Sequence, residues 1–176
     1  MLVVEDSIEL RAPPWRVWRT LTALDGYARW HPFVRSRGDA TPGAHVDYVF
    51  RNKAFERSFT AAATVLRNEE SVAFAWRLGV GRFLSFDETF EIEPTEQGSM
   101  LRHRMEGRGL VKLLGLRFMK EGLREAIVRT DEALDRYLRG VAPPPAKPSP
   151  GNRMKRRVAQ SRARHAPAPH PPGGDR

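Results

Sequence analysis

The spacing of apolar residues changes twice along this chain, and these changes constrain its fold more than any other feature. After a first extended segment at residues 2–10, apolar positions recur every three or four residues up to Trp30, which is typical of short amphipathic helices. From residue 33 to about residue 109 the chain is extended with a period near 2, the spacing of half-buried strands. A helical period then returns and continues to Gly140. The sequence therefore predicts a strand, two short helices, an antiparallel meander and one long closing helix.

The last two strands of this meander can be set in register from their side chains. Closing the chain over residues 95–98 places Ile92 opposite Leu101 and Phe90 opposite His103 on one face. On the other face the same register pairs Glu91 with Arg102, Thr89 with Arg104 and Asp87 with Glu106. The first of these outer pairs joins opposite charges, which stabilises neighbouring strands. The Asp87–Glu106 pair is unfavourable, and we expect it to be exposed to solvent.

The positive charge of the chain is concentrated at one end. The 176 residues carry a net charge of +9, but residues 1–140 hold 22 basic and 20 acidic side chains, whereas residues 141–176 hold eight and one. The same final segment contains nine of the 14 prolines and few large apolar groups, so it lacks the means to build a core. We expect one domain at residues 1–140 and a disordered, basic, proline-rich tail at residues 141–176.

Several classes of protein are excluded by what the sequence lacks. Without cysteine there can be no disulfide scaffold, thiol nucleophile or Cys-ligated zinc. No apolar run reaches the length of a membrane span, and acidic residues near the start argue against a signal peptide. His31, His45 and His103 have no metal-ligand spacing, and no phosphate-binding loop is present. We expect a cytoplasmic protein without a metal or cofactor, and we interpret His31 and His45 as surface or capping residues.

The order of elements favours one packing, in which a curved sheet wraps around the closing helix. The segments SIELRAPPWRVWRTLTALDGYARWHPFV (residues 7–34) and FDETFEIEP (residues 86–94), with the closing helix, resemble the START-like or SRPBCC superfamily in its polyketide cyclase/dehydrase branch. The resemblance covers residues 2–139 and implies an α+β helix-grip fold. In that fold an antiparallel sheet of six to seven strands wraps around a long C-terminal helix, with two short helices after the first strand.

The resemblance also implies a deep cavity for a small hydrophobic ligand such as a lipid, polyketide or quinone. The superfamily shares this cavity more than a catalytic set, so it transfers no active-site residues. Alternation along the strands predicts the residues that face inward. The predicted ligand-binding set is Trp30, Tyr48, Phe50, Phe59, Phe74, Trp76, Phe86, Phe90, His103, Met105, Met119 and Leu123. The alternative is that these side chains only fill a core, as buried aromatic residues do in most globular domains.

Two polar residues, Glu88 and His103, fall on the same inward face. A buried carboxylate needs a hydrogen bond, a cation or a proton. As a pair they are candidate catalytic residues, a general acid and base for a cyclisation or dehydration, because burial raises a carboxyl pKa toward that of histidine. The alternatives are a satisfied structural pair, or a Glu88 side chain that reaches the rim of the cavity.

Three functions are therefore compatible with the sequence. The first is a carrier or sensor of a small hydrophobic ligand, and the second is an enzyme of aromatase/cyclase type acting on a polyketide-like chain. The third is an adaptor whose tail contacts an anionic membrane or a nucleic acid, because NRMKRRVAQSRAR at residues 152–164 carries six positive charges. For this tail the alternative is a solvated appendage without a partner. The sequence leaves the ligand and the oligomeric state open.

Overall fold

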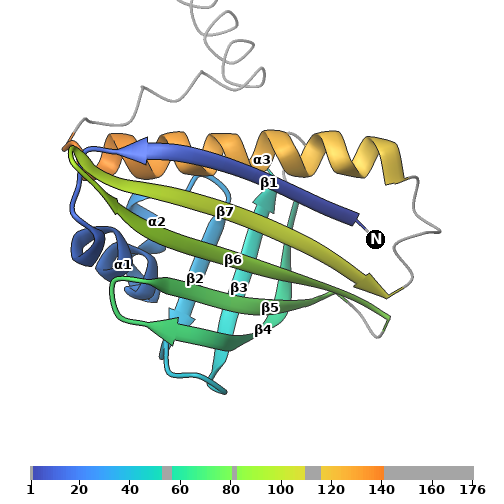
Figure 1. Ribbon diagram of the computed structural model, residues 1–176. Helices are drawn as coiled ribbons and strands as arrows, with labels where there is room; N and C mark the ends of the chain where they lie inside the picture. The colour runs from blue at the N-terminus through green and yellow to red at the C-terminus, as the bar shows by residue number, and fades with distance from the viewer. Residues whose placement is uncertain (1, 53–56, 81–82, 110–115, 141–176) are drawn as a thin grey trace, which may run out of the picture. The chain divides into compact units, whose positions relative to one another are not determined.

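The computed structural model describes residues 2–52, 57–80, 83–109 and 116–140 (Figure 1). The elements in chain order are β1 (Leu2–Leu10), α1 (Pro14–Thr22), the 3₁₀ turn η1 (Leu24–Gly26), α2 (Tyr27–Trp30), β2 (Val34–Gly38), β3 (His45–Asn52), β4 (Arg57–Glu69), β5 (Ala73–Val80), β6 (Leu84–Thr95), β7 (Gly98–Gly109) and α3 (Leu116–Leu138). The predicted order of elements is confirmed. The predicted tail, residues 141–176, lies outside the described residues, so its boundary and its disorder stay predictions.

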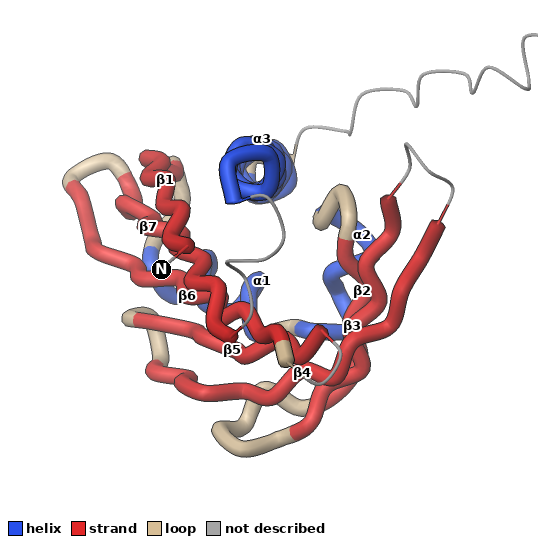
Figure 2. Tube along the Cα trace, turned by 90° about the vertical axis from the view of Figure 1, so that its right-hand side faces the viewer, coloured by secondary structure: helices blue, strands red, loops and turns tan. Residues whose placement is uncertain are grey.

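The seven strands form one antiparallel sheet in the order β1-β7-β6-β5-β4-β3-β2. Each strand from β2 to β7 pairs with its neighbour in the chain, and β1 closes the order by pairing with β7. Seen end on, the sheet is an open curve, and α3 lies across its mouth on the concave side (Figure 2). This arrangement is the predicted α+β helix-grip fold, with α1 and α2 following the first strand.

The concave face of the sheet carries the core, as the alternation of apolar residues predicts. Buried side chains on this face include Tyr48 of β3, Ala63 of β4, Trp76 of β5, Phe90 of β6 and Leu101 of β7. The predicted register of the last hairpin is also confirmed, since Ile92 lies opposite Leu101 and Glu91 lies opposite Arg102. Hydrophobic alternation and cross-strand charge pairs were therefore sufficient to fix this part of the sheet.

One expectation about the outer face of this hairpin is wrong. Asp87 does lie opposite Glu106, but it is only 7% exposed rather than open to solvent. Arg77 of β5 donates hydrogen bonds of 2.7 and 2.9 Å to its two oxygens, and Arg108 Nε lies 2.9 Å from Oδ2. Hydrogen bonds from Arg77 hold the pKa of Asp87 below its usual value, although burial would raise it. Arginines of the two neighbouring strands therefore cover this carboxylate.

The start of β7 requires a glycine. Gly98 has φ +153°, and a Cβ built there would lie 2.1 Å from the Leu10 carbonyl oxygen and 2.8 Å from Ala12 N. The next residue, Ser99, is fully buried and donates a 2.7 Å hydrogen bond to the Ala12 carbonyl. This close contact joins the β6–β7 turn to the segment between β1 and α1.

The closing helix presents a mixed face to the sheet. The helical period expected after residue 109 places apolar side chains on one face of α3, and of these Ile127, Leu134 and Leu138 are buried and Leu123 is partly buried. The same helix also buries Thr130, Asp131 and Asp135. The predicted beginning of this helix, just after Gly109, falls on residues outside the described part of the chain. Within the described residues, no helix is long and apolar enough to cross a membrane.

Candidate ligand-binding site

A cavity of about 320 Å³ lies between the concave face of the sheet and α3. It is bounded by the α2–β2 junction, β3, β6, β7 and one face of α3. Its lining residues are His31, Phe33, Val34, Tyr48, Phe50, Glu88, His103, Met105, Gly122, Leu123, Ala126, Ile127 and Thr130. Most of these are apolar, and the polar ones are few. Such a lining is typical of a site that holds an apolar molecule and orients it through a few polar contacts.

Two other recesses in the described part of the chain are larger but chemically less specific. One, of about 530 Å³, lies along β3 and β4 and includes Arg37 and His45. The other, of about 590 Å³, lies between α1 and the end of α3 and includes Trp15, Trp30 and Tyr137. Neither is lined by a buried titratable side chain. The cavity under α3 is therefore the candidate site.

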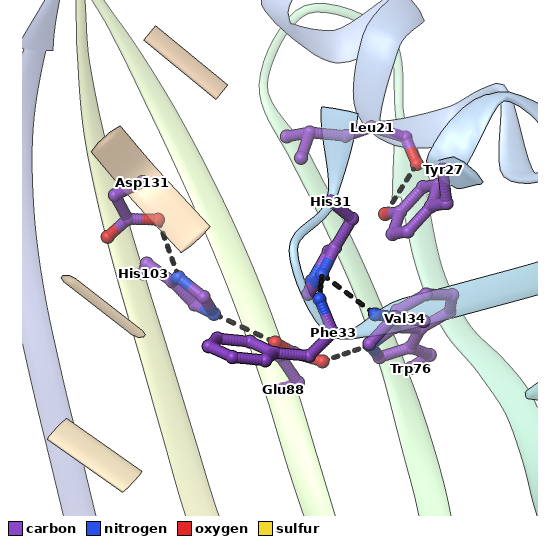
Figure 3. Close-up of polar contacts among 9 residues, drawn as sticks. All are labelled: Leu21, Tyr27, His31, Phe33, Val34, Trp76, Glu88, His103 and Asp131. Carbon is purple, nitrogen blue, oxygen red and sulfur yellow. Dashed lines mark hydrogen bonds and ion pairs between the residues drawn. The ribbon is translucent and has the colours of Figure 1, made fainter. Parts of the chain in front are cut away.

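A chain of hydrogen bonds connects four buried side chains at this cavity (Figure 3). Trp76 Nε1 donates to Glu88 Oε2 at 2.6 Å, and Glu88 Oε1 lies 2.9 Å from His103 Nε2. His103 Nδ1 lies 2.7 Å from Asp131 Oδ1. The side chains of His103 and Asp131 are each 1% exposed, and that of Glu88 is 5% exposed. Strands β5, β6 and β7 and helix α3 each contribute one member of this network.

The network stabilises charge on its central residues. Burial alone would lower the pKa of His103, but the charges and hydrogen bonds of Asp131 and Glu88 raise it to about 9. Burial would raise the pKa of Glu88, whereas the hydrogen bond and charge of His103 bring it below the usual value. Burial raises the pKa of Asp131, whose Oδ2 has no hydrogen-bond partner among the described residues. At neutral pH we therefore describe His103 as imidazolium and Glu88 as carboxylate.

His31 has a different role from the expected surface position. It is buried, and its Nδ1 accepts hydrogen bonds from the backbone N–H groups of Phe33 at 3.2 Å and Val34 at 3.1 Å. The capping interpretation thus fits, but a surface position is wrong, because the ring lies against Tyr27 and lines the cavity. Burial lowers the pKa of His31 to about 3, so the ring is neutral. His45, by contrast, is exposed on β3.

The structure divides the predicted ligand-binding set into three groups. Those that line the cavity are Tyr48, Phe50, His103, Met105 and Leu123, together with the candidate catalytic residue Glu88. Those that are buried beside it without lining it are Trp30, Phe74, Trp76, Phe86 and Phe90. The side chains of Phe59 and Met119 lie outside the described residues. Aromatic rings on the inward face therefore serve both core and cavity. The Phe90 ring, for example, packs 4.2 Å from the ring of His103.

Sequence reasoning missed Asp131 and the contribution of His31. A signal for Asp131 was present, since it follows Ile127 by four residues and precedes Leu134 by three, which places it on the apolar stripe of the helix. An acidic residue on a buried stripe needs a partner, and His103 was the candidate partner on the facing strand. For His31 the neighbouring Pro32 indicated only that the helix ends there.

The polar side chains that line the cavity could form hydrogen bonds with a bound molecule or exchange a proton with it. Glu88 presents an anionic acceptor at the cavity, His31 a neutral ring and Tyr48 a hydroxyl group. Within the described residues no group of three His, Cys, Asp or Glu side chains is placed to hold a metal ion.

Comparisons with known proteins agree with this geometry. A family model described as polyketide cyclase / dehydrase and lipid transport matches residues 1–139. Similar solved structures include a Nitrosomonas europaea protein, 20% identical with a TM-score of 0.66, covering 79% of this chain and 95% of that one. A Chromobacterium violaceum protein is 17% identical with a TM-score of 0.66, covering 78% of this chain and 98% of that one. A START superfamily protein from Mycobacterium smegmatis is 14% identical with a TM-score of 0.65, covering 78% and 97%. At these identities the likeness concerns the fold, and no curated protein matches the chain.

Proposed function

Because this chain belongs to the polyketide cyclase/dehydrase and lipid transport family, we propose that it binds one small, largely apolar molecule beneath α3. The observation that carries the proposal is the cavity of about 320 Å³ lined mainly by apolar side chains. Ligand pockets usually span about 300–1,000 Å³, so this one suits a molecule of one or two rings or a short chain. Met105 and Leu123 would supply apolar contacts to such a ligand.

Binding without obligatory catalysis is favoured by how the polar groups are engaged. Both nitrogens of His103 are hydrogen-bonded to carboxylates, of Glu88 on one side and Asp131 on the other. An imidazole in this position has no free nitrogen with which to take a proton from a ligand. Its positive charge instead holds Glu88 as an acceptor. This supports a carrier or sensor of an apolar ligand.

Native mass spectrometry of the purified full chain tests the proposal. We expect a bound apolar molecule, and we expect Ala126→Phe to abolish it, because Ala126 lines the cavity and the larger side chain occupies part of its volume. Ala28→Phe, on the exposed surface of α2, is the matched control and should retain the molecule. Leu123→Phe is a second variant in case Ala126→Phe does not fold. Equal retention by the cavity variants and the control would contradict the proposal.

An aromatase/cyclase-type enzyme is the second candidate, favoured by the contact of both Glu88 and His103 with the cavity. Glu88 would take a proton from a carbon next to a ligand carbonyl, and the adjacent His103 imidazolium would stabilise the resulting enolate. The assay is exchange of the methyl protons of 2-acetylnaphthalene in D₂O, followed by NMR. Faster exchange with the wild type than with Glu88→Gln would support an enzyme. Equal exchange with both would exclude this role for Glu88 and leave the carrier function in place.

A further inference from the structure

We propose that the ligand carries a hydroxyl group, alcohol or phenol, which docks between His31 and Glu88 with Tyr48 beside it. This inference rests on the proposed function, because it names the chemistry of the polar end of a ligand held in the same cavity. His31, Tyr48 and Glu88 come from three separate elements, the end of α2, β3 and β6, and all three line the cavity.

His31 supplies a hydrogen-bond donor in a fixed orientation. Its Nδ1 accepts from two backbone N–H groups, those of Phe33 and Val34, so Nδ1 carries no proton. A neutral ring then carries its proton on Nε2. No described residue accepts a hydrogen bond from this Nε2–H group. It is therefore available to an oxygen atom of a ligand.

Glu88 supplies the matching acceptor. Its Oε2 accepts a hydrogen bond from the indole N–H of Trp76, and its Oε1 is hydrogen-bonded to Nε2 of His103. A carboxylate oxygen can accept two hydrogen bonds, so each oxygen of Glu88 retains one lone pair. The two protein donors hold the carboxylate in place and leave the side chain on the wall of the cavity. The remaining lone pairs favour a ligand group that donates a hydrogen bond.

Tyr48 adds a hydroxyl group that can either donate or accept a hydrogen bond. Its side chain is buried on the concave face, with its ring 5.4 Å from that of Trp76. Burial and neighbouring charges, with no hydrogen bond, act on its hydroxyl group within the described part of the chain. Burial and the charge of Glu88 both raise the pKa of Tyr48, so the hydroxyl keeps its proton. It can therefore donate to a ligand oxygen or accept from a ligand hydroxyl.

Together these groups discriminate among simple polar groups on a ligand. A hydroxyl accepts from His31 and donates to Glu88 with a single oxygen atom. An ether or ketone cannot donate to Glu88, and a carboxylate would be repelled by it. An ammonium group cannot accept from His31, and a methyl group leaves both protein groups unpaired, which is costly in a buried site.

Three naphthalenes of similar shape test the inference: 2-naphthol, 2-methoxynaphthalene and 2-methylnaphthalene. Their dissociation constants for the full chain would be measured at pH 7 by intrinsic fluorescence and calorimetry. We expect 2-naphthol to bind about tenfold or more tightly than 2-methylnaphthalene, the effect of a hydrogen bond to a charged group. The methoxy compound, which accepts but cannot donate, should show no such advantage.

Single substitutions test which residues cause the preference for 2-naphthol over 2-methylnaphthalene. His31→Asn keeps an oxygen that can accept from the backbone of Phe33 and Val34 but removes the Nε2–H donor. We expect it to reduce the preference for 2-naphthol over 2-methylnaphthalene to about threefold or less. His45→Asn makes the same change at an exposed position and should keep the full preference. Tyr48→Phe is the second variant if His31→Asn does not fold, and it should also reduce the preference.

The outcomes separate this inference from the proposed function. If 2-naphthol and 2-methylnaphthalene bind equally, and Ala126→Phe weakens both, the cavity binds apolar molecules but the hydroxyl inference is overturned. A preference that neither His31→Asn nor Tyr48→Phe reduces also overturns it. If none of the three probes binds, the proposed function itself is contradicted. A preference that the His31 or Tyr48 variant reduces, and that His45→Asn retains, supports both.

Discussion

The charged network beneath α3 should make the stability of this protein fall as pH rises above neutrality. His103 has a pKa of about 9 in the folded protein, against a usual value of 6.5. A folded pKa above the unfolded one means that the folded state holds the proton more tightly. The resulting stabilisation is complete below about pH 6.5 and is lost as pH rises through about 9.

The size of this effect follows from the difference between the two pKa values. Each unit corresponds to about 1.4 kcal/mol, so raising the pKa of His103 from 6.5 to about 9 contributes about 3 kcal/mol. The side chain is 1% exposed, so solvent does not screen the interaction appreciably. The charge of Asp131 makes the largest contribution to raising this pKa, and Asp131→Asn removes that charge. The variant should therefore lose about half of the pH dependence or more.

Urea unfolding from pH 6 to 9.5 measures the effect, and the ring protons of His103 report its titration by NMR. We expect the wild-type free energy of unfolding to fall by about 3 kcal/mol over this range, and that of Asp131→Asn to fall by about half as much or less. His45→Asn removes an exposed histidine and should follow the wild type. A flat wild-type profile, with His103 titrating near 6.5, would refute the reasoning.

Three further predictions concern the fold around the cavity. Burial holds the pKa of His31 at about 3 in the folded protein, against a usual value of 6.5. Between these pH values His31 is protonated in the unfolded chain but neutral in the folded one. Stability should fall from pH 6.5 toward pH 3, and less steeply in His31→Asn, as measured by urea unfolding. Gly98→Ala places a Cβ 2.1 Å from the Leu10 carbonyl and should cost more than about 1 kcal/mol, whereas Gly26→Ala meets no atom closer than 3.7 Å and should cost less. Leu101→Ala, at a fully buried position, should cost about 2–5 kcal/mol in the same assay, and Leu66→Ala, 41% exposed, within about 0.5 kcal/mol.

The sheet could be predicted from the sequence because its determinants are local. Alternation assigns each strand residue to one face, and a shift of one residue would turn the apolar set toward solvent. In the last hairpin the charge pair Glu91–Arg102 independently supported the register that placed Ile92 opposite Leu101, and both pairs were confirmed. The covering of Asp87 was not predicted in this way, because it depends partly on Arg77 of β5, which lies outside the hairpin, as well as on Arg108 of β7.

The polar network was only half predictable for a related reason. Glu88 and His103 fall on the same face of one hairpin, so strand parity alone indicated that they could meet. Asp131 joins them from α3, and its partner depends on how far the helix is displaced along the sheet. Hydrophobic periodicity defines which face of a helix is buried but not this displacement.

The division between core and cavity was beyond sequence reasoning. Phe90 and Met105 both occupy inward positions on adjacent strands. Phe90 is packed against His103 and Phe74, whereas Met105 faces the void. Strand parity cannot separate these cases, because a void depends on how closely α3 approaches the sheet at each point. The predicted ligand-binding set therefore mixes residues that line the cavity with residues that support it.

A crystal structure of the full chain with 2-naphthol tests the central claim most directly. We expect a naphthalene ring beneath α3, against Met105 and Leu123, with its oxygen within hydrogen-bonding distance of His31 Nε2 and of the Glu88 carboxylate. A ring bound elsewhere on the protein, with side chains filling the space beneath α3, would contradict it.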